Sequence, residues 1–182
     1  MHGPALSGWL LVTLCGATAA YCLVRMRSCS GETRAAAGGE ALMSLGMAVM
    51  AVPAAVFALP GWAWVVYAAV FGAAALRALR PAHRGSHHVH HAVGSLAMIY
   101  MAVAMTTGGG VHAGHSAAGV PLLTGALLAY YAVYVLRSGV RLVPVTSPAG
   151  GAVTVSWGAR PELAPACRLA MGLAMLAMLL AL

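Results

Sequence analysis

Six long, nearly uncharged apolar runs constrain this chain more than any other feature. They cover approximately residues 4–24, 40–59, 61–79, 88–106, 118–136 and 163–182. A helix needs about 20 mostly apolar residues to cross the hydrocarbon core of a bilayer. Only 7% of the residues are charged, so the chain cannot cover a soluble surface, which typically needs about 25%. The sequence therefore predicts an all-α, polytopic membrane helix bundle of six transmembrane helices, forming one domain over residues 1–182.

The arginines predict how this bundle is oriented. All ten basic residues are arginines, and they lie in or beside the first, third and fifth connecting segments, while the second and fourth have none. Basic loops stay on the cytoplasmic side of a membrane. We therefore expect both termini to be extracytoplasmic, a cytoplasmic loop over 138–162, and a multi-pass location in the plasma membrane. The lipid bilayer is the expected partner. Nucleic acid is excluded, because no soluble segment carries a basic face interleaved with aromatic residues.

Two of the loops carry weaker patterns. Residues 152–157 alternate in a β-prone manner after a turn-forming stretch at 147–151, which is compatible with a small hairpin or with an irregular loop. The fourth loop is rich in glycine and holds His112 and His115. These two histidines either collect or release an ion near Met105, or are incidental to a flexible loop.

Methionines are distributed unequally among the six runs. Apart from Met1 and Met26, they fall three to a helix on the second, fourth and sixth runs, and the other three runs have none. Each set uses gaps of three and four residues, which place its members on one helix face. The three stripes are Met43, Met47 and Met50; Met98, Met101 and Met105; and Met171, Met175 and Met178.

Each methionine stripe continues into polar residues at its N-terminal end. Glu40 precedes Met43 by three residues, Cys167 precedes Met171 by four, and His87 and His91 are i, i+4 partners at the start of the fourth run. In the expected topology these three helices run in one direction, so their polar ends meet in the cytoplasmic leaflet. We expect the first, third and fifth helices to be scaffold that faces lipid.

These residue types suit a soft metal ion. Thioether and thiolate ligands select Cu(I), and imidazole also suits copper, whereas zinc prefers Cys, His and carboxylate. Competing interpretations are that methionines only fill an apolar core, that the histidines cap a helix, and that Glu40 is stabilised by the helix dipole or by Arg168. The predicted metal-binding set is Glu40, Met43, Met47, Met50, His87, His91, Met98, Met101, Met105, Cys167, Met171, Met175 and Met178.

Four functions remain open on these residues. The favoured one is a copper-binding membrane protein for Cu(I) transport, storage or delivery, which would involve copper-delivery or copper-dependent partner proteins. A zinc-dependent intramembrane hydrolase would use the helical His-x-x-x-His pair with Glu40 and Cys167. The others are a haem-binding electron carrier and a metal-free structural protein. We identify no catalytic residues and no phosphate-binding loop, which favours binding over catalysis. Oligomerisation is left open.

The chain also resembles a known family. Three segments carry the resemblance, namely residues 40–48 (EALMSLGMA), residues 87–91 (HHVHH) with Met98 and Met101, and residues 166–175 (ACRLAMGLAM). Together with a length near 180 residues, they are similar to a family of small actinobacterial integral membrane proteins, rich in Met and His, to which no function is assigned. The resemblance implies the fold class and the membrane location, and it implies nothing about chemistry.

Overall fold

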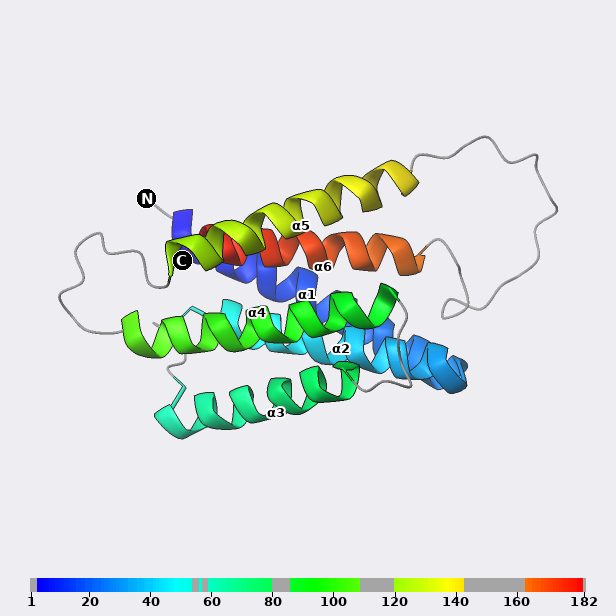
Figure 1. Cartoon of the computed structure of the whole chain (residues 1–182), viewed down its shortest axis with the longest axis horizontal. Coiled ribbons are helices and arrows are strands. Elements are labelled where there is room, and N and C mark those ends of the chain that lie inside the picture. The colour runs from blue at the N-terminus through cyan, green and yellow to red at the C-terminus, as the bar shows by residue number, and fades with distance from the viewer. Residues whose placement is uncertain are drawn as a thin grey trace.

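The computed structural model describes residues 3–53, 56, 59–79, 86–108, 120–142 and 163–181. These residues form six helices packed side by side in an elongated bundle (Figure 1). In chain order they are α1 (Gly3–Ser28), α2 (Gly31–Ala51), α3 (Gly61–Leu79), α4 (Ser86–Gly108), α5 (Pro121–Leu142) and α6 (Leu163–Leu180). The predicted all-α class is confirmed. The two loop patterns, at 147–157 and around His112 and His115, lie outside the described residues.

Four helices are long and apolar enough to cross a membrane, which makes this a membrane protein. They are α1 from Leu6 onward, α3, α5 and α6, while α4 contains the shorter apolar stretch Val89–Ala104. Helix α2 is not among them, because polar residues and glycines lower its hydropathy, even though three methionines lie on its inner face. Its buried positions include Glu40, Ser44 and Gly46. A helix enclosed by other helices does not need lipid-compatible side chains on every face.

Consecutive helices pair as antiparallel hairpins, and α2 joins the pairs. The pairs are α1 with α2, α3 with α4, and α5 with α6, and α2 additionally contacts α4 and α6. The first hairpin is tight: only Cys29 and Ser30 separate the two helices, and Gly31 has φ +58°. Glycine adopts this left-handed conformation without the steric cost that a Cβ atom would impose.

The bounds of α2 differ from those expected from hydropathy. The apolar run suggested residues 40–59, whereas the helix begins at Gly31 and ends at Ala51. It ends there because Pro53 disfavours helical backbone at the preceding residue, and Val52 is extended at ψ 124°. It begins early because the hairpin with α1 carries the polar residues 31–39 alongside the end of that helix. Glu40 therefore lies well inside α2 and not at its start.

The arginine-bearing helix ends gather at one end of the bundle. Arg25 and Arg27 lie in the last turn of α1, Arg77 in that of α3 and Arg141 in that of α5. Figure 1 shows these helix ends together with the starts of α2, α4 and α6, while both termini of the chain lie at the opposite end. We call the arginine-bearing end the basic end.

The close approach of α2 to α3 and α4 depends on Gly46. A Cβ atom there would lie 2.8 Å from Met98 Cε and nearer still to the Phe71 ring. We expect Gly46→Ala to destabilise the folded protein by about 1–3 kcal/mol through overpacking. Gly72→Ala is the control, because no atom lies within 4 Å of its added methyl group and alanine favours the helix. Unfolding of both variants in mild detergent measures the difference, and equal stabilities would contradict the packing.

Candidate metal centre and the buried carboxylate

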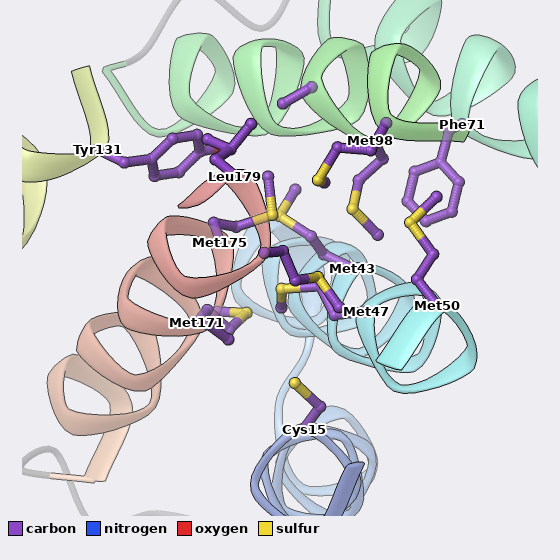
Figure 2. Packing of buried hydrophobic residues seen from close by; sticks show 14 of the residues in the cluster. Cys15, Met43, Met47, Met50, Phe71, Met98, Tyr131, Met171, Met175 and Leu179 are labelled. Carbon is purple, nitrogen blue, oxygen red and sulfur yellow. The ribbon is translucent and has the colours of Figure 1, made fainter. Parts of the chain in front are cut away.

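Eight of the nine stripe methionines converge in the centre of the bundle. Each is at most 8% exposed, and all belong to one contiguous buried cluster. Figure 2 shows Met43 and Met47 of α2 near Met171 and Met175 of α6, with Met98 reaching in from α4 and Cys15 from α1. Met50 of α2 lies beside Phe71. We call this group the sulfur core: Met43, Met47, Met50, Met98, Met101, Met171, Met175, Met178 and Cys15. The side chain of the ninth, Met105, lies outside the described part of the chain.

The helices expected to be scaffold that faces lipid are mostly exposed along α3 and α5, but each of the three also contributes a side chain to this centre. Cys15 of α1 is 2% exposed, Phe71 of α3 is 3%, and Tyr131 of α5 is 1%. The α1 contribution was detectable in the sequence. Cys15, Ala19 and Cys22 follow gaps of four and three residues, the same one-face spacing as the methionines. The apolar surroundings of these residues concealed it, because no hydropathy contrast marks the face.

Polar groups enter the sulfur core at two places. The Tyr67 hydroxyl donates a hydrogen bond to Met98 Sδ over 3.6 Å. Met43 and Tyr131 share the space beside Gly94, where a Cβ atom would lie 2.9 Å from Met43 Sδ and 3.4 Å from Tyr131 Oη. Tyr131 Oη is buried and has no hydrogen-bond partner among the described residues. A buried hydroxyl without a hydrogen-bond partner destabilises an apolar core. The Tyr131 hydroxyl therefore gives this part of the core a polar group that could still accept or donate a hydrogen bond.

A buried carboxylate lies between the sulfur core and the basic end. Glu40 is 2% exposed and accepts hydrogen bonds from two arginines. Arg25 Nη1 donates to Oε2 over 3.2 Å, and Arg168 Nε donates to Oε1 over 2.7 Å. The Cys22 thiol donates a longer hydrogen bond to Oε2, with Sγ 3.8 Å away. Of the interpretations left open for Glu40, the structure shows the pairing with Arg168. Arg25 is a second partner that the sequence did not identify.

The remaining polar site residues lie around this carboxylate. Cys167 is close enough to Glu40, Cys22 and Arg25 to interact with them electrostatically. The His91 ring packs on α2, with Cε1 3.3 Å from the position of a Cβ atom at Gly39. The His87 side chain is outside the described residues. Where side chains are described, no three His, Cys, Asp or Glu residues are arranged to hold a metal ion. Among the described residues, the sulfur core therefore offers more potential metal ligands than the polar residues around Glu40.

Removing the charge of Glu40 tests this arrangement. Glu40→Gln leaves Arg25 and Arg168 partly buried without a counter-charge, so we expect a loss of about 3 kcal/mol in the free energy of unfolding, at the lower end for a broken buried ion pair. The matched control is Glu32→Gln on the same helix, which is exposed and should cost about 0.3–1 kcal/mol through the helix dipole. Denaturant titration in detergent measures both, and similar losses would show that the carboxylate is not a structural link.

Comparison with known proteins gives a family and no activity. No curated protein and no solved structure matches the chain significantly. A family model does match, over residues 32–182, which takes in nearly all of α2 and everything after it. Glu40, the methionine stripes and Cys167 fall inside the matched range, whereas Arg25 and Cys15 precede it. Since the model covers most of the sequence, the chain belongs to the family described as Domain of unknown function (DUF5134).

Proposed function

We propose that the protein binds Cu(I) in its sulfur core and serves in copper transport, storage or delivery within the plasma membrane. The observation that carries the proposal is the convergence of eight buried thioethers and one thiol from four helices. Neutral thioethers and thiolates are the ligands that soft Cu(I) prefers over harder ions. Methionine packing alone also fills irregular space, but it does not require every stripe to meet in a single cluster with a buried cysteine.

The dimensions of the sulfur core support a series of sites. Met43 to Met50 on α2, and Met171 to Met178 on α6, each cover seven residues, or about 10 Å at 1.5 Å per residue. These two stripes lie along the axis of the bundle, between the basic end and the opposite end. An ion bound by two or three thioethers at a time would have further thioethers within reach. Cys15 would bind the metal as a thiolate and so supply a negative charge, its proton being released to the solvent when the metal binds.

Glu40 has a supporting role in this proposal and is not a ligand. Both carboxylate oxygens already accept hydrogen bonds from arginine. Two guanidinium groups beside one carboxylate leave a local excess of positive charge, which disfavours a cation at that point. Met98 is also a weaker candidate ligand than its neighbours, because its sulfur accepts the Tyr67 hydroxyl. The favoured ligands are the thioethers of α2 and α6, together with Met101 and Cys15.

Copper content tests the proposal directly. We expect protein purified in mild detergent and supplied with Cu(I) to retain copper, and Met47→Leu combined with Met101→Leu and Met175→Leu to lose it. Leucine conserves volume and apolarity, so the fold is expected to persist at a cost below about 1.5 kcal/mol per site. Mass-spectrometric metal analysis, with zinc and the haem absorption band recorded on the same sample, measures the outcome.

The control for this variant is Met26→Leu. Met26 packs against Gly38 near the basic end, outside the sulfur core, so its replacement should leave copper content unchanged. Unchanged copper content in the triple variant, or equal losses of copper in both variants, would show that the methionine stripes only pack the core. Zinc in place of copper would instead favour the hydrolase, which the polar residues near Glu40 first suggested.

We further propose that all six helices span the membrane with both termini extracytoplasmic. Support comes from the gathering of arginines at one end of the bundle, which the positive-inside rule assigns to the cytoplasm. Alkaline phosphatase fused after Leu182 should then be active, and the same enzyme inserted after Arg84 should be inactive. The reverse pattern would show that both termini are cytoplasmic, and activity at both positions would exclude six spans.

A further inference from the structure

A cavity of about 750 Å³ lies beside the buried carboxylate, between α5, α6, the middle of α2 and the start of α4. Helix α5 forms one wall of the cavity with a continuous stripe of residues that is apolar in one part and basic in the other. Ala129 and Val133 form the inner part, and Arg137 and Arg141 the part at the basic end. All four are exposed at the surface of the chain, so the cavity opens laterally along α5. From Ala129 to Arg141 the stripe extends about 18 Å, at 1.5 Å per residue.

The cavity is strongly positive at the basic end. Arg137, Arg141 and Arg168 line it, against the single acid Glu40. Glu40 is already engaged by Arg168 and by Arg25, which approaches from α1. Neither Arg137 nor Arg141 forms a salt bridge with the acids whose side chains are described. Arginine presents planar donors that match a phosphate group, often with two hydrogen bonds at once.

Aromatic contacts hold the middle of the cavity wall in place. The His90 ring stacks on Tyr134 with centroids 4.0 Å apart and planes at 8°, and its Nδ1 lies 3.2 Å from Tyr130 Oη. Tyr134 in turn packs closely on Gly172 of α6, where a Cβ atom would lie 3.2 Å from its ring. The wall therefore joins α4, α5 and α6 through side chains with apolar bodies and polar edges, a combination suited to the boundary between headgroups and acyl chains.

The inner wall is apolar. Met43, Met171 and Pro165 line the cavity from α2 and α6, opposite the α5 stripe. A ligand that fits must have an anionic group beside the arginines and a hydrocarbon portion beside Ala129 and Val133. A small anion would leave the apolar part unfilled, and a hydrocarbon would leave the arginines unpaired. An anionic phospholipid has both parts in the required order, and basic pockets between transmembrane helices are recognised binding sites for such headgroups.

We propose that this cavity is a binding site for an anionic phospholipid. The phosphate is held by Arg137 and Arg141, with Arg168 adjacent, and an acyl chain lies along the α5 stripe. The site borders the sulfur core, because Met43 and Met171 line the cavity and also belong to that core. The arginines that hold the phosphate are not among the proposed copper ligands. Because Arg168 also holds Glu40, the bound phosphate sits next to the ion pairs that connect α1, α2 and α6. Lipid binding therefore reinforces the α5–α6 side of the bundle at the basic end.

The experiment compares three probes on the purified full-length chain in detergent. Dioleoylphosphatidylglycerol supplies the anionic headgroup with acyl chains, dioleoylphosphatidylcholine the same chains with a neutral headgroup, and inorganic phosphate the anion alone. Native mass spectrometry counts bound lipid and gives apparent dissociation constants. We expect phosphatidylglycerol to bind selectively. Its apparent dissociation constant should rise about tenfold or more in the double variant Arg137→Gln with Arg141→Gln, because charge-assisted hydrogen bonds are lost.

The control is Arg27→Gln with Arg77→Gln, which removes the same charge from exposed positions at the basic end that do not line the cavity. It should leave binding unchanged. Val133→Trp should weaken binding while keeping every arginine, because it fills the apolar part. Equal losses in both double variants, or equal binding of phosphatidylcholine, would overturn the proposal. Competition by inorganic phosphate as effective as by the lipid would assign the site to free phosphate instead.

Discussion

The ion pairs of Glu40 are the interaction on which the rest of the bundle depends. Two charges removed from water each carry a desolvation cost of several kcal/mol, which only good geometry and further hydrogen bonds offset. Here one carboxylate from α2 receives Arg25 from α1 and Arg168 from α6, so the ion pairs join three helices at a single point. These pairs fix the register of the helices at the basic end, and the sulfur core begins one helical turn further along α2.

Helix α2 packs against several neighbours in this bundle, and its buried face differs from that of a purely apolar helix. It contacts α1, α4 and α6, and its buried face combines Glu40 and Ser44 with glycines and methionines. Small residues allow neighbouring backbones to approach closely, and Gly46 gives room to both Phe71 and Met98. The same composition explains why hydropathy alone does not rank α2 as a membrane span. Its neighbours cover much of its surface, and the outer face that remains exposed carries the apolar residues Leu45 and Val49.

The two proposed sites divide the bundle by chemistry. The sulfur core offers soft, mostly uncharged donors in a dry interior, whereas the cavity beside α5 offers guanidinium groups next to an apolar wall. The two sites are neighbours, because Met43 and Met171 belong to the sulfur core and also line the cavity. Glu40 and Arg168 line the same cavity at its basic end. Arg137 and Arg141 can be altered without changing a proposed copper ligand.

The sequence by itself determined the helical class, the membrane environment and the convergence of three stripes. Periodicity and apolar length report directly on which face of a helix is buried and whether it can face lipid. It left the pairing of Arg168 with Glu40 open as one of several roles for that carboxylate. Only the tertiary structure placed Cys15 in the sulfur core and Arg25 beside Glu40. The face of α1 that carries Cys15 has no contrast in hydropathy, and the partner of Arg25 depends on how α1 and α2 pack. The cavity along α5 was likewise decided by packing, since a space between helices depends on how neighbouring helices diverge and not on the periodicity of any one of them.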